Sequence, residues 1–385
     1  MDDQAPSGDA RLLSCLAQMV RLGASDLFLT VGAPPTLKRQ GAFSHLGEAA
    51  LSVHDVRALA YSVMRKAQQE EFETRLECDL AFQTQQGERF RINVYLQRGQ
   101  VGMVVRHVSS KIPSLDALGL PDILRQLALL KGGLVLAVGA AGSGKTTTLA
   151  SMLDYRNETA QGHILTVEDP IEYLHSHKKS LVTQREVGLD TLSYDEALRH
   201  AMREAPNVIM IGEIRDRLTM QHAMHYAEAG HLCVSTLHAN NASQAVQRIL
   251  NFFPEDAHSQ LLMDLSLNLK AVVALRLIMG TGGRMVPAVE VMLLSHYVSD
   301  LIQKGQMEGL RTAIERSGEV GMCTFDQSLY DLFKRGEITQ ADAVAHADNK
   351  TDMTLKMRLA AGASLGAEGM QMAHDDEDQA PPLPH

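Results

Sequence analysis

The segment that most constrains the fold of this chain is residues 139–146, Gly-Ala-Ala-Gly-Ser-Gly-Lys-Thr, which fits the pattern G-x-x-x-x-G-K-[ST]. An apolar run at residues 134–138 comes directly before it, and a helix is expected from residue 146 onward. Glycines at these positions let successive backbone amides point inward, where they add to the positive helix end and hold phosphate groups. The glycine spacing fails the G-x-G-x-x-G register, which disfavours a dinucleotide site. The segment therefore predicts a strand, a phosphate-binding P-loop and a helix.

Seven residues in and after this loop are candidate nucleotide ligands. Lys145 would bring its charge to the β- and γ-phosphate oxygens of ATP, and the hydroxyl of Thr146 would ligate Mg²⁺. The other candidates are Gly139, Gly142, Ser143, Gly144 and Thr147. We therefore expect ATP and Mg²⁺ as cofactors.

Beyond residue 114 the chain alternates between short apolar runs and helical patterns. The expected strands are residues 134–138, 164–167, 208–211 and 232–236, and helices are expected to begin near residues 146, 193 and 218. This order predicts a largely parallel sheet with helices on both faces. Apolar residues at 261–273 predict one long helix after Pro254, and further helices are expected at residues 298–304 and 324–335.

The first hundred residues follow a different pattern. A helix that ends at Gly23 and a second one from Ser52 to about Arg75 are expected, followed by strands at residues 90–96 and 100–105. These elements predict a small α+β domain over residues 1–108. A linker at residues 109–114 then leads to an α/β domain over residues 115–360, and residues 361–385 are predicted to be a disordered acidic, proline-rich tail.

Composition excludes several classes of protein. A formal net charge of -10 and 4% aromatic residues, with no Trp, disfavour nucleic acid as a partner. Four scattered cysteines predict neither a disulfide framework nor a zinc site. The acidic first residues do not resemble a secretory signal, and no run approaches the roughly 18 apolar residues of a membrane span. We therefore expect a cytoplasmic protein with peripheral membrane contact only.

Three further segments follow the P-loop in order: residues 166–172 (Thr-Val-Glu-Asp-Pro-Ile-Glu), residues 209–216 (Ile-Met-Ile-Gly-Glu-Ile-Arg-Asp) and residues 230–238 (Gly-His-Leu-Cys-Val-Ser-Thr-Leu-His). They resemble the Asp box, Walker B segment and His box of secretion ATPases. Their order and spacing are similar to those of the PilT/PilU family of type IV pilus retraction ATPases, especially its PilU members. The resemblance covers about residues 10–355. It implies a PAS-like N-terminal domain and a RecA-like ATPase domain with C-terminal helices.

Two glutamates are candidate catalytic residues because each follows an expected strand, at the carboxyl edge where open α/β sheets place their sites. The resemblance implies that Glu172 is the general base for water and that Glu213 acts on Mg²⁺ or water. Gly212 stands where many P-loop enzymes carry a metal-binding Asp, which transfers that role to Glu213 and Thr146. The alternative is that either glutamate is a solvated carboxylate at a loop edge.

Two histidines and two arginines complete the candidate set. His231 and His238 flank an expected strand, and the resemblance implies that they couple phosphate and a neighbouring subunit to the site. Structural histidines are the alternative. Arg91 and Arg106 lie on adjacent expected strands, and the resemblance implies that they reach the nucleotide phosphates. A solvated polar face, or the same role for the nearby Arg89 or Arg98, remains open.

The resemblance implies a homohexameric ATPase motor that powers pilus retraction and twitching motility at the cytoplasmic face of the inner membrane. The implied partners are a PilT-like paralogue and an inner-membrane pilus platform protein. The family's signature Ala-Ile-Arg-Asn-Leu-Ile-Arg-Glu is replaced by residues 297–304, Tyr-Val-Ser-Asp-Leu-Ile-Gln-Lys, which favours a PilU-type accessory. Three alternatives remain: a nucleotide-switched structural adaptor, a type II secretion or pilus assembly ATPase, and a RecA-type nucleic-acid motor. Assembly ATPases usually carry a four-cysteine zinc site, which the sequence lacks.

Overall fold

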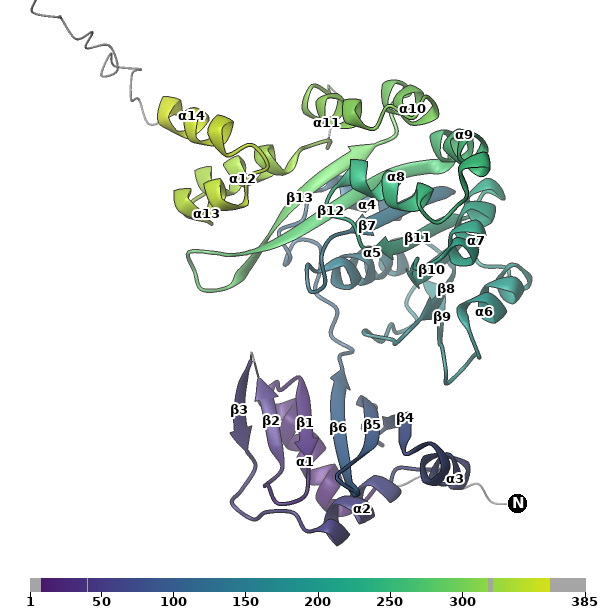
Figure 1. Ribbon diagram of the computed structural model, residues 1–385, viewed down its shortest axis with the longest axis vertical. Helices are drawn as coiled ribbons and strands as arrows, with labels where there is room; N and C mark the ends of the chain where they lie inside the picture. The colour runs from purple at the N-terminus through teal and green to yellow at the C-terminus, as the bar shows by residue number, and fades with distance from the viewer. Residues whose placement is uncertain (1–7, 40, 318–320, 361–385) are drawn as a thin grey trace, which may run out of the picture.

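The computed structural model describes residues 8–39, 41–317 and 321–360 of the 385-residue chain. Two sheets, each with its own hydrophobic core, are joined by an extended segment that follows β6 (Figure 1). The fold is therefore mixed α/β, with an N-terminal sheet domain and a second domain built on a mainly parallel sheet, as the sequence predicted. The expected tail lies outside the described residues.

The N-terminal sheet has six antiparallel strands in the order β3-β2-β1-β6-β5-β4. Its elements are α1 (Ala10–Leu22), β1 (Asp26–Leu29), β2 (Thr36–Arg39), β3 (Ala42–His45), α2 (Val53–Tyr61), α3 (Lys66–Arg75), β4 (Glu77–Gln83), β5 (Arg89–Gln97) and β6 (Gln100–Val108). Helix α1 ends at Gly23 in a left-handed conformation, as predicted. Apolar residues of β4, β5 and β6 alternate toward the core, which leaves the intervening polar residues on the other face.

The single helix expected from Ser52 to Arg75 was wrong, because the chain forms two helices. The capping box of Ser52 begins α2 as expected, but α2 ends at Tyr61. Side chains replace the interrupted backbone hydrogen bonds. Gln68 accepts the amide of Arg65 at 2.9 Å, and Gln69 donates to the carbonyls of Tyr61 and Met64. These local contacts satisfy backbone groups that the break would otherwise leave without hydrogen-bond partners.

The second sheet has seven strands in the order β13-β12-β7-β11-β10-β8-β9, and only the β12–β13 pair is antiparallel. Its elements are α4 (Ile123–Ala128), β7 (Gly133–Val138), α5 (Lys145–Thr159), β8 (Gly162–Glu168), β9 (Ser180–Glu186), α6 (Tyr194–Ala201), β10 (Val208–Glu213), α7 (Arg217–Glu228), β11 (Leu232–Leu237), α8 (Ala242–Leu250), α9 (His258–Asn268), β12 (Leu269–Met279) and β13 (Met285–Leu293). All four expected strands form the centre of this sheet. Helices cover both of its faces (Figure 1).

The prediction of one long helix over residues 261–273 was also wrong for the second half of that range. Helix α9 ends at Asn268, and the next residues form β12, which pairs in parallel with β7. Residues 271–275 are buried in this strand, which lies between β7 and β13. A short apolar run suits a buried strand as well as a helix, so only its neighbours decide between the two.

Among the described residues after the sheet, the chain forms five helices: α10 (His296–Gln303), α11 (Glu308–Glu315), α12 (Phe325–Lys334), α13 (Gln340–His346) and α14 (Lys350–Ala360). Of these, α10 and α12 were predicted. Residues 297–304, where the family signature is replaced, lie on α10 and its C-terminal end. In the described part of the chain no helix is both long enough and apolar enough to cross a bilayer.

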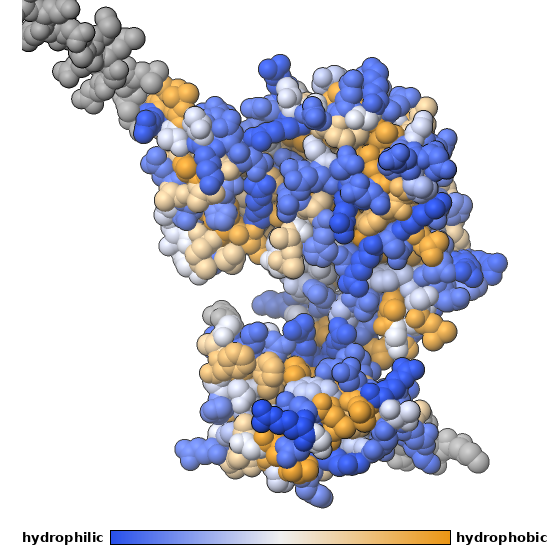
Figure 2. Space-filling view, viewed as in Figure 1, coloured by the Kyte–Doolittle hydropathy of each residue, from blue (hydrophilic) through white to orange (hydrophobic). Residues whose placement is uncertain are grey.

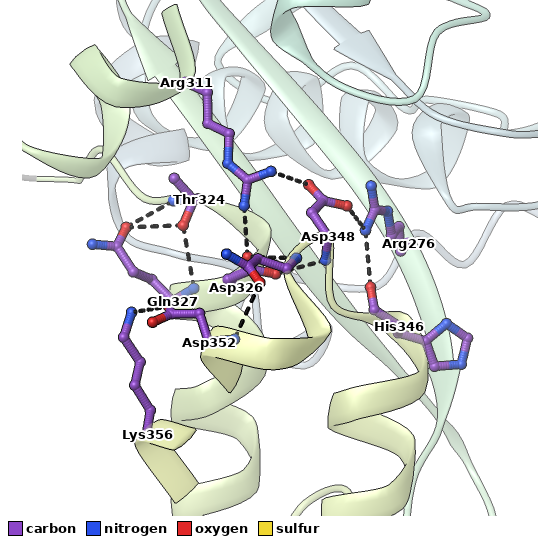
Figure 3. Close-up of polar contacts among 10 residues, drawn as sticks. Arg276, Arg311, Thr324, Asp326, Gln327, His346, Asp348, Asp352 and Lys356 are labelled. Carbon is purple, nitrogen blue, oxygen red and sulfur yellow. Dashed lines mark hydrogen bonds and ion pairs between the residues drawn. The ribbon is translucent and has the colours of Figure 1, made fainter. Parts of the chain in front are cut away.

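An ion-pair network ties the last helices to the β12–β13 hairpin (Figure 3). Arg276 of β12 pairs with Asp348 at 2.7 Å and donates to the carbonyl of His346 at 3.0 Å. Arg311 donates to Asp326 at 2.7 Å, and the Asp326 carboxylate also accepts the amides of Asp348 and Asn349. Since Asp326 is only 8% exposed, these contacts compensate for burying its charge.

Candidate nucleotide site

The P-loop connects β7, in the middle of the sheet, to α5. Gly142 and Gly144 have φ values of 74° and 91°, in the left-handed region that favours glycine. A Cβ atom at Gly139 would lie 2.3 Å from Ser143 Oγ and 2.6 Å from the carbonyl oxygen of Leu275. The loop therefore requires glycine at three of the predicted positions.

Lys145 is the first residue of α5 and is 8% exposed. Its Nζ donates to the carbonyls of Gly139 at 3.0 Å and Ala140 at 2.9 Å, so the ammonium group lies over its own loop. Burial lowers the pKa of Lys145, and the charges of Glu213 and Glu172 act against this effect. Phosphate oxygens could replace the two carbonyls as acceptors without removing Lys145 from the loop.

A cavity of about 270 Å³ adjoins the P-loop and extends to the β12–β13 hairpin. Ser143, Gly144 and Thr147 form one side of it. Its remaining lining is both apolar and charged, and includes Leu118, Leu275, Leu277, Asp116, Arg284 and Glu337. Ser143 Oγ is buried and has no hydrogen-bond partner among the described residues. Such a pocket suits the nucleoside part of a ligand whose phosphates bind the loop.

Glu213 and His238, which the sequence placed on different strands, meet at the carboxyl edge of the sheet. Glu213 ends β10, and its Oε1 lies 2.8 Å from Nε2 of His238, which directly follows β11. Its Oε2 accepts from Nε of Arg215 at 2.5 Å. The Glu213 side chain is 14% exposed, so this carboxylate remains accessible at the same edge as the P-loop.

Glu172 lies on the loop after β8 and is exposed. Its charge opposes the lowering of the Lys145 pKa by burial. The next residue, Tyr173, shares a hydrogen bond of 3.0 Å with Thr147 of α5. The structure therefore brings the loop of Glu172 against the P-loop helix, and the action of Glu172 on the γ-phosphate stays a prediction.

Two buried glutamates of this edge were missed by the sequence analysis. Glu168, at the end of β8, and Glu186, at the end of β9, are 4% and 5% exposed. Burial raises the pKa of Glu168 to about 7, although hydrogen bonds from Thr166 and Gln184 oppose the effect. Glu168 belongs to the Asp-box segment, but nothing in that segment indicates that this carboxylate is buried.

Three other predicted residues lie apart from the P-loop. His231 precedes β11 at the opposite end from His238, and its carbonyl accepts the amide of Gly133 at the start of β7. Arg91 and Arg106 are cross-strand partners in the N-terminal sheet. Arg106 Nε donates to Asp26 at 2.9 Å, within its own domain. Within one chain, the structure does not bring these three side chains to the phosphate loop.

The packing around Gly212 gives a physical reason for its departure from the usual metal-binding Asp. A Cβ atom there would lie 2.9 Å from the Tyr194 hydroxyl and 3.2 Å from the Cα atom of Glu168. There is no room for a side chain in this arrangement. The carboxylate nearest to that position along the chain is Glu213.

Thr146 and Glu213 have the hard oxygen donors that suit Mg²⁺. In the described parts of the chain, no group of three or more His, Cys, Asp and Glu side chains is arranged to hold a metal. The chemistry of these two donors fits an ion that takes its other ligands from phosphate and water rather than from a protein cage.

A P-loop in the middle of a parallel sheet, with two acidic residues at the same edge and a cavity beside it, defines a P-loop nucleotide-binding protein. Comparison with known proteins identifies the family within this class. Residues 14–308 match the family of type II/IV secretion system proteins. The chain is 48% identical over 373 residues to the type IV pilus ATPase PilU of Pseudomonas aeruginosa. The aligned region covers 95% of this chain and 97% of PilU.

The type IV pilus retraction ATPase PilT of Pseudomonas aeruginosa is 40% identical, over 85% of this chain and 95% of PilT. A crystal structure of the pilus retraction motor PilT with bound ADP matches with a TM-score of 0.83 at 39% identity. That match covers 88% of this chain and 98% of the PilT chain. The chain therefore belongs to the type II/IV secretion system protein family, in which it groups with PilT and PilU, as the sequence predicted.

Proposed function

We propose that this chain is an ATPase motor that powers type IV pilus retraction and twitching motility, as a PilU-type accessory to a PilT ring. The observation that carries the proposal is that the P-loop of Lys145 follows β7 and Glu213 ends β10 at the same edge of the sheet, while the loop of Glu172 is hydrogen-bonded to the P-loop helix through Tyr173 and Thr147. The chain also belongs to this family. ATP is the substrate, and Mg²⁺, when bound, neutralises phosphate charge and is held by Thr146 and Glu213.

Each residue has a defined task in this proposal. The amides of residues 142–145 and the positive end of α5 bind the phosphates. Lys145 exchanges the carbonyls of Gly139 and Ala140 for phosphate oxygens. Glu172 takes a proton from the attacking water, and His238 holds Glu213 in place.

A homohexameric ring gives the remaining predicted residues a role. His231 lies at the opposite end of β11 from the P-loop, so we assign it to communication with a neighbouring subunit. Arg91 and Arg106 would reach the phosphates when the N-terminal domain moves. The domains are proposed to span residues 1–108 and 115–360. The ring acts at the cytoplasmic face of the inner membrane, with a pilus platform protein and a PilT-like paralogue as partners.

The catalytic assignment is tested by ATP turnover of the purified full-length protein. Lys145→Ala and Glu172→Gln are each expected to lower kcat by about 100-fold or more, since each removes a charge or a base used in the transition state. Lys131→Ala and Glu48→Gln, which change exposed residues, serve as matched controls. Turnover at the wild-type rate in both site variants would refute the assignment.

The biological assignment is tested in cells that hold this ATPase with or without a PilT-like paralogue. An accessory motor is expected to support pilus retraction only when the paralogue is present. A nucleotide-switched adaptor would support the paralogue equally well after Glu172→Gln, whereas a motor would lose this support.

A further inference from the structure

Two buried carboxylates lie side by side beneath the loop that carries Glu172. Glu168 and Glu186 are the last residues of β8 and β9, and they are paired in the register of these parallel strands. Neither was a candidate from the sequence. A buried carboxylate needs hydrogen-bond partners, and Glu186 finds one of them in the loop above.

Glu186 holds the backbone of that loop directly, and Glu168 is linked to it through Gln184. Glu186 Oε2 accepts the amide of Ile171, the residue before Glu172, at 3.2 Å. Glu168 Oε1 accepts from Gln184 Nε2 at 3.1 Å. Gln184 holds the same loop from β9, because it donates to the carbonyl of Tyr173 at 2.9 Å. Anchoring the Ile171 amide and the Tyr173 carbonyl, one on each side of Glu172, sets the direction in which the Glu172 side chain leaves the backbone.

Glu186 has a second partner, which comes from the N-terminal domain. Nη2 of Arg89, the first residue of β5, lies 3.5 Å from Glu186 Oε2, the same oxygen that accepts the Ile171 amide. Burial raises the pKa of Glu186, and the charges of Arg89 and Arg91 oppose this effect. Loss of Arg89 would leave a carboxylate that is 5% exposed without the cation that contacts it, at the base of the catalytic loop.

The segment that joins the two domains runs beside the same loop. The carbonyl of Ser109 accepts the amide of Leu174 at 3.1 Å, and Ser109 forms a parallel bridge with Tyr173. The two lobes meet here at a narrow waist (Figures 1 and 2). Contacts across this waist therefore converge on the loop of Glu172 rather than on the nucleoside cavity.

We propose that Glu186 is a positioning residue for Glu172 and that Arg89 holds the Glu186 carboxylate in place. Hydrolysis by a subunit then depends on its N-terminal domain being seated against its own ATPase domain. The inference rests on the proposed function, since it requires Glu172 to act on ATP. A purely structural ion pair is the competing account. It predicts altered stability with an unaltered turnover number.

The test is a double-mutant cycle on the full-length protein with Arg89→Gln, Glu186→Gln and both together. Gln at position 186 keeps an oxygen for the Ile171 amide but loses the charge that faces Arg89. Each single variant is expected to lower kcat by roughly five- to tenfold, with the KM for ATP unchanged. The double variant is expected to be no slower than the slower single variant, because both remove the same contact. Arg89→Lys should recover part of kcat.

The control pair is Arg57 and Glu73, which form a 2.5 Å ion pair between α2 and α3 of the N-terminal domain. Arg57→Gln and Glu73→Gln should leave kcat unchanged. The inference is overturned if Arg89→Gln keeps the wild-type kcat, or if the KM for ATP rises while kcat stays constant. It is also overturned if the reduction of kcat in the double variant equals the product of the two single reductions. If the wild type is no faster than Lys145→Ala, the proposed function itself fails. If only the Arg89 and Glu186 variants match the wild type, the inference alone fails.

Discussion

Replacing Glu168 by Gln should stabilise the protein at alkaline pH but not at acid pH. The side chain is 4% exposed, and burial raises its pKa from 4.5 to about 7. Because the folded-state pKa is raised, the contribution of Glu168 to stability is fully present below pH 4.5 and is lost as the pH rises through 7. Gln resembles the protonated acid in shape and polarity, and it does not ionise.

The size of the effect follows from the two pKa values. Their difference of about 2.5, at 1.36 kcal/mol for each pKa unit, corresponds to a total cost of roughly 3 kcal/mol for ionising Glu168 in the folded protein. Part of this cost is already present at pH 5.5, because the unfolded carboxyl group titrates near pH 4.5. Between pH 5.5 and 8.5 the free energy of unfolding of the wild type should therefore fall by about 2 kcal/mol relative to that of Glu168→Gln.

Urea unfolding followed by circular dichroism at pH 5.5 and 8.5 measures this difference. Glu48→Gln, a change to an exposed loop carboxylate, is the control and should follow the wild type at both pH values. The reasoning is refuted if the difference in free energy of unfolding between Glu168→Gln and the wild type is the same at the two pH values. It would mean that Glu168 keeps one protonation state throughout this range.

Two further predictions concern packing and the C-terminal helices. Gly212→Ala should cost about 1–3 kcal/mol of stability, because the new methyl group would lie 2.9 Å from the Tyr194 hydroxyl. The double variant with Tyr194→Phe should recover part of this loss in thermal unfolding, and no recovery would mean that the hydroxyl is not the obstacle. Asp326→Ala should cost about 3–5 kcal/mol, since it leaves two amides without their acceptor and Arg311 with the more distant Asp348, at 4.0 Å. Hydrogen exchange in α13 and α14 should rise for Asp326→Ala and not for the surface control Asp300→Ala, and equal protection in both would contradict the role of the network.

Much of the fold could be predicted from local patterns. The P-loop, the four central strands and the helix starts depend on residues that are close in the sequence, such as the capping box of Ser52. The break after Tyr61 and the change from helix to strand at Leu269 could not be predicted. At Leu269 an apolar stretch suits more than one element, and distant neighbours decide which one forms. After Tyr61 the break is held by side-chain contacts of Gln68 and Gln69, which the apolar pattern does not indicate.

The sequence by itself determined the class of ligand and the alternation of strands and helices along the chain, because the P-loop and this alternation are short-range patterns. The tertiary structure alone decided which carboxylates are buried and what each one contacts. Glu186 meets Ile171 from 15 positions earlier in the chain and Arg89 from 97 positions earlier. Burial and pKa depend on such long-range encounters, and a linear motif carries no record of them.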